Sequence, residues 1–317
     1  MRPEVIVIGA AIADIPLSPV GPEVFANHST EVQNIRIQVG GDAANEALTL
    51  ARLGHAPALV SVVGRDALGD YVLRALEDGG VDTSCVCRSP EMDTGVNVVL
   101  VREGGERTFV TSRAGSLRRL ALPHILHALE GPALAEAKVA CLASLFVSPA
   151  LTLADTAALF DALKAKGLAL CADTTRRKRG ETLAEAGPAL SRLDYFFPNR
   201  SEAALLTGRD DPDAIADALL DCGVGHVVLK LGGDGCLLCS AGEHHRIPAC
   251  RDTRCVDTTG AGDTFAGAFI AALLEGRSFA DCGRFANAAA SLCVQQVGAV
   301  GRWTRAEVER RLSELSI

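Results

Sequence analysis

The sequence alternates short apolar runs with stretches of helical periodicity through most of its length. Apolar runs without polar alternation are typical of strands buried on both faces of a parallel sheet. Parallel neighbours need a crossover connection, which a helix supplies. We therefore predict an α/β fold with a central, mostly parallel sheet and helices on both faces. The predicted strands are residues 5–11, 58–63, 139–145, 168–172, 195–197 and 227–231, and the predicted helices are 42–54, 66–78, 149–166, 213–222 and 260–275.

Two segments depart from this alternation. Residues 15–39 contain three prolines and end in the alternating stretch 35–39, Ile-Arg-Ile-Gln-Val. Residues 94–112 alternate apolar and polar positions on either side of a Glu-Gly-Gly-Glu turn. Both patterns predict antiparallel strands with one face toward solvent or a partner. No linker separates either segment from the rest, so we predict one domain spanning residues 1–317.

The composition limits the partners that this chain can have. With 317 residues and 48% hydrophobic content the chain can bury a large core, and with 4% aromatic residues that core must consist mainly of Ala, Leu and Val. A formal net charge of −8 argues against a nucleic-acid binder, since such proteins usually carry a basic surface. No apolar run approaches the ~20 residues that a membrane span needs, so no membrane partner is expected.

The eleven cysteines do not indicate a disulfide framework, because their number is odd and many lie in apolar runs. Buried, reduced thiols in a cytoplasmic protein explain them more simply. Cys236 and Cys239 have the spacing of metal ligands. They fall in a predicted strand, however, where positions three apart point to opposite faces. Zinc is therefore disfavoured.

A glycine-rich motif precedes the last predicted helix. Residues 257–265 read Asp-Thr-Thr-Gly-Ala-Gly-Asp-Thr-Phe, and an apolar helical run follows. The unpaired amides and positive dipole end of a helix N-terminus attract anions, which indicates a phosphate site. Neither the P-loop pattern nor the three-glycine dinucleotide fingerprint is present. A Gly-x-Gly fragment alone would more simply be a turn that caps a core helix.

Asp263 distinguishes this loop from a passive phosphate cradle. A carboxylate among anion-binding amides would repel phosphate unless it had a separate task. The natural task is to accept the proton of a hydroxyl that attacks phosphorus, while the amides of Gly260, Ala261 and Gly262 stabilise the transferred group. Because a helix N-terminus favours negative charge, we expect Asp263 to stay ionised and its pKa not to be raised.

A second glycine pair lies near the other end of the chain. Residues 40–47 read Gly-Gly-Asp-Ala-Ala-Asn-Glu-Ala and open the predicted helix 42–54. Asp42 is the expected N-cap and Gly54 the expected C-terminal stop. By itself this motif is more simply structural than functional.

Together, in this order and at this separation, the two motifs resemble the two signatures of the ribokinase-like PfkB family of carbohydrate kinases. The resemblance extends along nearly the whole chain. The further matching segments are 5–14 (first strand and sugar-contacting Asp14), 198–203 (Asn-x-x-Glu), 230–235 (nucleotide-binding glycine loop) and 284–289 (helix beside the adenine).

The resemblance implies an ATP- and Mg²⁺-dependent kinase in which Asp263 is the catalytic base and the 260–262 amides form an anion hole. The implied substrate-binding residues are Asp14, Gly40, Gly41 and Asn45. The implied ATP-binding residues are Asn199, Lys230, Gly232, Gly235 and Asn287. Glu202 would hold Mg²⁺ through water, since Mg²⁺ dehydrates reluctantly. From the residues alone, Asn199 and Glu202 simply cap the helix that follows.

Other implications concern a second cation and the lid. Many relatives bind a monovalent cation at positions that match Asp257 and Thr259, together with backbone groups around Cys293, Gln296 and Gly298. Arg302 replaces a small residue there, so dependence on K⁺ is left open: a guanidinium could substitute for the ion or exclude it.

The segments 15–39 and 94–112 would form an antiparallel lid over the sugar, and the lid permits a homodimer.

The substrate is the least determined part of the prediction. Residues 173–176 resemble the Asp-x-Asn-x-Arg of some sugar-acid kinases, but Thr175 replaces the Asn, which disfavours a ketogluconate. Among the candidate substrates, a free pentose or hexose is the first choice. A nucleoside kinase would need an aromatic base pocket, and only Phe25 and Phe109 lie near the lid. A sugar-phosphate kinase would need at least two lid arginines near Asp14; the candidates are Arg36, Arg107 and Arg113. A non-catalytic sensor on this fold would not need Asp263.

Overall fold

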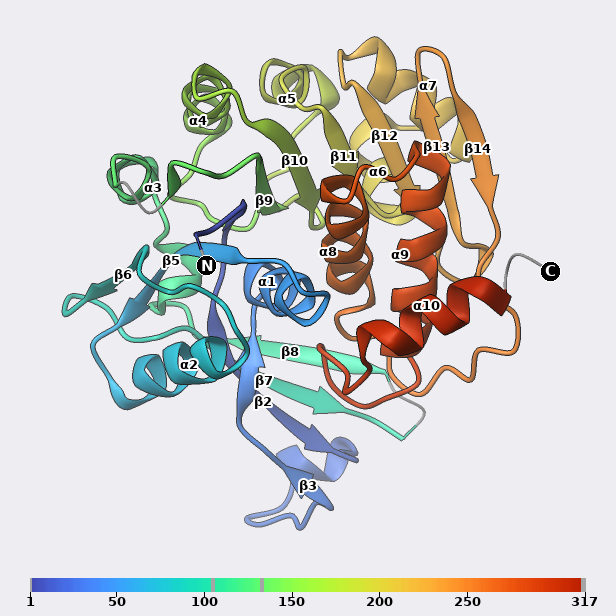
Figure 1. Ribbon diagram of the computed structural model, residues 1–317. Helices are drawn as coiled ribbons and strands as arrows, with labels where there is room; N and C mark the ends of the chain where they lie inside the picture. Colours follow the sequence, from blue (N-terminus) through green and yellow to red (C-terminus); the bar gives the residue numbers. More distant parts are fainter. Residues whose placement is uncertain (1, 104–105, 132–133, 315–317) are drawn as a thin grey trace.

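A large sheet runs through the middle of the protein (Figure 1). The computed structural model describes residues 2–103, 106–131 and 134–314. Within them the strand order is β14-β13-β12-β11-β10-β9-β1-β5-β6, parallel from β12 to β6 with an antiparallel edge of β13 and β14. These strands are β1 (Val5–Ile8), β5 (Pro57–Gly64), β6 (Val86–Ser89), β9 (Val139–Leu145), β10 (Ala169–Thr174), β11 (Tyr195–Phe197), β12 (His226–Lys230), β13 (Cys236–Ser240) and β14 (His244–Ile247).

Helices cover both faces of this sheet, each over its own apolar core. Successive residues of β1 alternate between the cores: Val5 and Val7 face one, Ile6 and Ile8 the other. The first core holds α1 (Asp42–Arg52), α2 (Ala67–Asp78), α8 (Ala261–Leu274), α9 (Phe279–Cys293) and α10 (Arg305–Glu314). The second holds α3 (Leu122–Leu129), α4 (Leu153–Ala165), α5 (Leu183–Leu190), α6 (Arg200–Thr207) and α7 (Pro212–Asp221). The predicted α/β class is confirmed.

Some predicted boundaries differ from the structure for local reasons. The first strand ends at Ile8, because the chain leaves the sheet at Gly9 with φ +153°. The helix predicted from residue 149 begins at Leu153, where the Thr152 hydroxyl caps it. Asp42 is not an N-cap: Gly41 holds that position with φ +97° and no side-chain cap, and Asp42 is the first helical residue.

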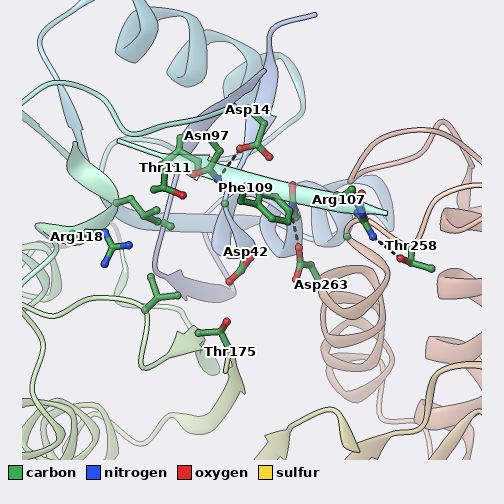
Figure 2. A pocket seen from close by; sticks show the side chains of 18 of the residues that line it. Asp14, Asp42, Asn97, Arg107, Phe109, Thr111, Arg118, Thr175, Thr258 and Asp263 are labelled. Atoms are coloured by element: carbon green, nitrogen blue, oxygen red, sulfur yellow. Dashed lines mark hydrogen bonds between the residues drawn. The ribbon is translucent and has the colours of Figure 1, made fainter. Parts of the chain in front are cut away.

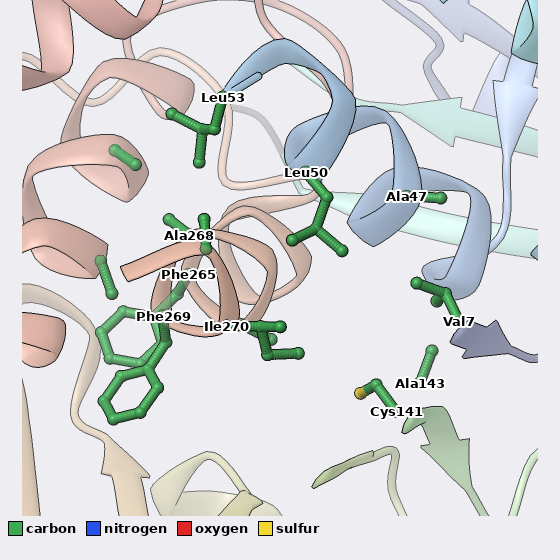
Figure 3. Close-up of a cluster of buried hydrophobic side chains, with 14 of the residues drawn as sticks. Val7, Ala47, Leu50, Leu53, Cys141, Ala143, Phe265, Ala268, Phe269 and Ile270 are labelled. Atoms are coloured by element: carbon green, nitrogen blue, oxygen red, sulfur yellow. The ribbon is translucent and has the colours of Figure 1, made fainter. Parts of the chain in front are cut away.

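The helices α1 and α8 pack closely against each other (Figure 3), and Gly267 of α8 lies at their contact. A Cβ on Gly267 would lie 3.0 Å from the Glu46 carbonyl oxygen, so the backbones approach as far as glycine permits. Leu50 of α1 and Ala268 of α8 are fully buried between them. This packing sets the N-termini of both helices at the same end of the sheet.

A second, smaller sheet comes from the two segments that break the alternation. It consists of β2 (Ile12–Ser18), β3 (Asn34–Ile35), β4 (Gln38–Gly40), β7 (Val96–Val101) and β8 (Arg107–Thr111), and we call it the small sheet. Its pairs are antiparallel except β2 with β7, which is parallel. The predicted strand 35–39 is divided opposite Pro16, which has no N–H to donate. The glycines of the predicted Glu-Gly-Gly-Glu turn lie outside the described residues.

Seven of the eleven cysteines are buried, as predicted, whereas Cys87 and Cys255 are exposed and Cys85 and Cys222 are partly buried. All eleven are free, and Cys236 and Cys239 face different cores, so they cannot share a metal ion. Among the described helices, none combines the length and apolarity that a bilayer crossing demands.

We predict that Phe269→Ala lowers the free energy of unfolding by about 3–5 kcal/mol. Phe269 is fully buried and packs edge-on against Phe197, with ring centroids 5.2 Å apart. Phe25→Ala is the control, because 82% of that side chain is exposed, and it should change stability by less than about 0.5 kcal/mol. Urea unfolding measures both. Equal effects would contradict the assignment of Phe269 to the core.

Candidate active site

A cavity of about 690 Å³ opens between the small sheet and the N-termini of α1 and α8 (Figure 2). It lies beyond the carboxyl ends of the parallel strands, where open α/β sheets bind their ligands. The sequence-predicted residues that line it are Asp14, Gly41, Asn45, Thr259, Gly260 and Asp263. Residues from opposite ends of the chain thus share one site.

Asp263 lies in the first turn of α8, directly beyond a loop that only glycine can form. Gly260, the N-cap, has φ +71°, and a Cβ there would lie 1.9 Å from the Ala299 carbonyl oxygen. The Asn45 amide donates to Asp263 Oδ2 at 2.7 Å. Asn45, placed by α1, therefore orients the carboxylate that α8 brings into the cavity.

The environment of Asp263 raises its pKa, contrary to the expectation from its helix-terminal place. Burial is the main cause, and the Asn45 hydrogen bond and the positive charge of Lys230 oppose it. Desolvation of the carboxylate thus outweighs the helix dipole. A carboxyl group with a raised pKa is a stronger base when ionised, which suits proton abstraction.

Asp14 lies on β2 at the far side of the cavity from α8. A Cβ on Gly40 would lie 2.2 Å from the Asp14 carboxyl, so only glycine leaves room for that side chain. Burial raises the pKa of Asp14 to about 6, and the amide of Asn97, which donates to Oδ1 at 3.1 Å, opposes this rise. Asn97 was not singled out from the sequence; its only signal is its place in an alternating strand.

Lys230, at the end of β12, is the cation around which the buried carboxylates gather. Its ammonium lies 2.5 Å from Asp173 Oδ2. A Cβ on Gly262 would lie 3.2 Å from the same ammonium, so Lys230 also reaches the glycine loop. Burial raises the pKa of Asp173 to about 7, although Lys230 opposes the rise. Burial also raises the pKa of Asp42 well above its ordinary range, reinforced by Asp263 and Asp173.

From the sequence, Asp42 was predicted only as an N-cap, and Asp173 only as the first residue of the segment that resembles a sugar-acid kinase motif. Asp173 ends a buried strand on the ligand-binding edge, which was a usable signal. Glu46 was also passed over: it is fully buried, neither carboxyl oxygen has a hydrogen-bond partner in the described structure, and burial raises its pKa well above the ordinary range. Its signal is a charged residue in the middle of a helix, next to the small and apolar positions Ala43, Ala47 and Leu50.

Several residues matched to ATP or Mg²⁺ make contacts within the fold: Asn199, Gly235 and Asn287 of the ATP set, and Glu202, matched to Mg²⁺. The Asn199 side chain accepts from the Glu202 N–H at 2.9 Å, and Glu202 Oε2 accepts from the Asn199 N–H at 3.3 Å, a capping box for α6. Asn287 donates to the Pro248 carbonyl at 3.1 Å. Gly235 has φ +91° and tolerates no Cβ, while Gly232 begins the short 3₁₀ turn Gly232–Asp234.

The residues matched to a monovalent cation also lie together, yet their acceptors are already engaged. Asp257 Oδ1 accepts from the N–H and hydroxyl of Thr259 at 2.9 and 2.6 Å, and Oδ2 accepts from the Gly298 N–H at 2.9 Å. Arg107 lies 3.2 Å from Oδ1. Three donors thus surround Oδ1, which has about two acceptor positions, so no position remains on that oxygen for a free cation; Oδ2 accepts one hydrogen bond.

Side chains beside the matched backbone groups also make contacts within the fold. The Cys293 thiol donates to the carbonyl of Thr259, and Gln296 Oε1 accepts from the Arg302 N–H. Arg302 itself is exposed, so its guanidinium does not fill the place of an ion.

The arginines near the cavity are distributed unevenly. Arg107 and Arg118 line the cavity itself, and Arg118 lies at its end away from Asp263 (Figure 2). A neighbouring hollow of about 520 Å³ shares Arg118 and is lined further by Arg113 and Arg119. None of these last three has an ion-pair partner among the described residues. Arg36 is exposed and lines neither space.

Comparison with known proteins agrees with this geometry. The sequence matches the pfkB family carbohydrate kinase over residues 2–305. It is 30% identical to the ribokinase of Haemophilus influenzae and 33% identical to the 2-dehydro-3-deoxygluconokinase of Bacillus subtilis, in each case over 84% of both chains. The Arabidopsis thaliana ribokinase, solved with ribose and ATP, has a TM-score of 0.81 and 29% identity and covers 98% of this chain and 99% of its own.

The resemblance seen in the glycine motifs is thereby confirmed, along with the ribokinase-like fold. The match runs through both motifs and ends at Arg305, the first residue of α10. The chain belongs to the pfkB family of carbohydrate kinases.

Proposed function

We propose that this ATP-dependent carbohydrate kinase transfers the γ-phosphoryl group to a hydroxyl of a small free sugar, a pentose or hexose, with Asp263 as the general base. The observation that carries this proposal is the pairing of Asn45 with Asp263 at 2.7 Å inside a cavity that also holds Asp14. Asp14, Asn45 and the backbone at Gly40 and Gly41 offer the directional acceptors and donors that sugar hydroxyls require.

In this mechanism the acceptor hydroxyl gives its proton to a carboxylate oxygen of Asp263 as its oxygen bonds to the γ-phosphorus. The bond from that phosphorus to the bridging oxygen breaks, and ADP leaves with the bond electrons. The backbone N–H groups of Gly260, Ala261 and Gly262 stabilise the charge on the transferred group. Lys230, against Gly262, adds a positive charge on the nucleotide side.

The donor set fits Mg²⁺ and a nucleotide. Asp42, Asp173, Glu202 and Asp263 interact electrostatically with one buried cation, Lys230, so the site holds excess negative charge. Oxygen ligands of this kind suit Mg²⁺, which neutralises phosphate charge when bound. We assign Glu202 to Mg²⁺ through water. We assign the triphosphate to Asn199, Lys230 and the loop from Gly232 to Gly235. Asn287 is assigned to the adenine side, where its side chain holds residues 247–248 in place.

A second candidate substrate is a sugar that already carries a carboxylate or phosphate. The hollow with Arg113, Arg118 and Arg119 adjoins the cavity and supports this candidate, because unpaired guanidinium groups bind such anions in a bidentate manner. The likeness to a 2-dehydro-3-deoxygluconokinase also favours a sugar acid. Thr175, where some sugar-acid kinases have Asn, weighs against it. An aromatic base pocket for a nucleoside has little support beyond Phe109.

The small sheet is proposed to act as a lid that excludes water during transfer. We place the protein in the cytoplasm, since its eleven cysteines are free.

The activity is tested with Asp263→Asn and a panel of acceptors, with ADP release as the measurement. We expect ATP consumption with one class among ribose, deoxyribose, fructose, hexonic acids, sugar phosphates and nucleosides. The Asn variant should lose about 10²–10⁴-fold in kcat, because it cannot accept a proton. If no acceptor stimulated ADP release, or if the folded variant kept most of its activity, the proposal would be wrong.

The pH dependence of kcat tests the proposed base. Activity should fall as the pH drops through the raised pKa of Asp263, since the protonated form cannot accept the hydroxyl proton. Asn45→Ala removes a hydrogen bond that lowers this pKa, so its acidic limb should move to higher pH. Asn27→Ala removes an exposed amide that does not line the cavity and serves as the control. Acidic limbs at the same pH in all three proteins would contradict the assignment.

A homodimer through the small sheet is tested by sedimentation. Ile35 and Val110 of that sheet are 63% and 54% exposed, which favours an apolar partner surface. We expect a wild-type dimer and a monomeric Ile35→Asp/Val110→Asp variant, because a buried charge without a partner opposes association. A wild-type monomer at high micromolar concentration would contradict the proposed dimer.

A further inference from the structure

Arg107, the first residue of β8, reaches from the small sheet to the loop that precedes α8 (Figure 2). Its guanidinium donates to Thr258 Oγ1 at 2.5 Å and lies 3.2 Å from Asp257 Oδ1. The side chains of Arg107 and Asp257 are only 19% and 18% exposed, so solvent screens this pair less than a surface ion pair.

Asp257 organises the loop that Arg107 touches. Its two oxygens accept from Thr259 and from the Gly298 N–H, which ties residues 257–259 to the segment after α9. Gly260 and the N–H groups of the proposed anion hole follow directly. Burial acts to raise the pKa of Asp257. The hydrogen bonds from Thr259 and Gly298 and the positive charge of Arg107 outweigh it and lower the pKa, so the carboxylate stays ionised.

We propose that Arg107 is a positioning residue: with the small sheet seated over the cavity, its guanidinium fixes the 257–260 loop and takes the place that a free monovalent cation would need at Asp257. This inference rests on the proposed function, because it concerns the loop that receives the phosphoryl group. The contact of Arg107 with this loop couples closure of the small sheet over the sugar to the shape of the anion hole. Phosphoryl transfer then requires the lid arginine and does not require K⁺.

The first arm of the test needs no substrate. Hydrogen exchange of the backbone amides of residues 258–262 is compared in wild type, Arg107→Ala and Arg107→Lys. The matched control is Arg36→Ala, which removes an exposed arginine between β3 and β4 of the same small sheet. We expect faster exchange in Arg107→Ala, an intermediate rate in Arg107→Lys, and the wild-type rate in Arg36→Ala. Equal exchange in all four proteins would overturn the proposal.

The second arm uses ATP, Mg²⁺ and the best acceptor of the panel. Arg107→Ala should lose about tenfold or more in kcat while KM for ATP changes by less than about threefold, because the hole acts on charge in the transition state. Arg107→Lys should recover part of the loss, since an ammonium keeps the charge but not the planar geometry. The wild-type enzyme should have the same kcat in KCl and in tetramethylammonium chloride of equal ionic strength.

Two kinetic outcomes would contradict the proposal: a loss in Arg107→Ala that Arg107→Lys does not reduce, or wild-type activity that requires K⁺. Thermal melting shows whether each variant is folded. If no acceptor in the panel is phosphorylated, the proposed function fails, and hydrogen exchange still decides whether Arg107 orders the loop.

Discussion

The site depends on the close packing of α1 against α8. Small residues at the contact let the backbones approach, and the two helices begin at the same end of the sheet. As a result the Asn45 amide lies within a hydrogen bond of Asp263, although 218 positions separate them in the chain. A bulkier residue at Gly267 would push the helices apart and break a contact far from itself, so packing in the core sets geometry in the cavity.

Much of the fold could be read from the sequence because its signals are local. The strand at residues 139–145 was predicted to the residue, since seven successive buried positions fit a strand between two helical layers. The glycines of both motifs were also predictable, because a positive φ or a close backbone approach admits little else. The divided strand opposite Pro16 was not foreseen, since a break in one strand depends on which residue lies across from it.

The parts of the site that were not foreseen depend on distant contacts. Asp42 fits an N-cap by sequence, but Gly41 holds that position and the Asp42 carboxylate accepts a hydrogen bond from Ser144. The Asp263 pKa was expected to be ordinary from its helix end alone, whereas burial by neighbouring elements raises it. Arg107 was considered only as a phosphate ligand. Its contact with Asp257 appears once the small sheet is placed against the α8 loop.

The carboxyl groups near Lys230 have a thermodynamic consequence. Burial gives Asp173 a pKa of about 7 and raises that of Glu202, so part of this cluster is protonated at neutral pH. A polyanion that docks beside these groups raises their pKa further, because like charges disfavour the ionised form. At the proposed site, entry of a nucleotide without Mg²⁺ would therefore be linked to the uptake of protons from solvent, whereas the charge of Mg²⁺ would oppose that uptake. The apparent heat of binding would then vary with the ionisation enthalpy of the buffer.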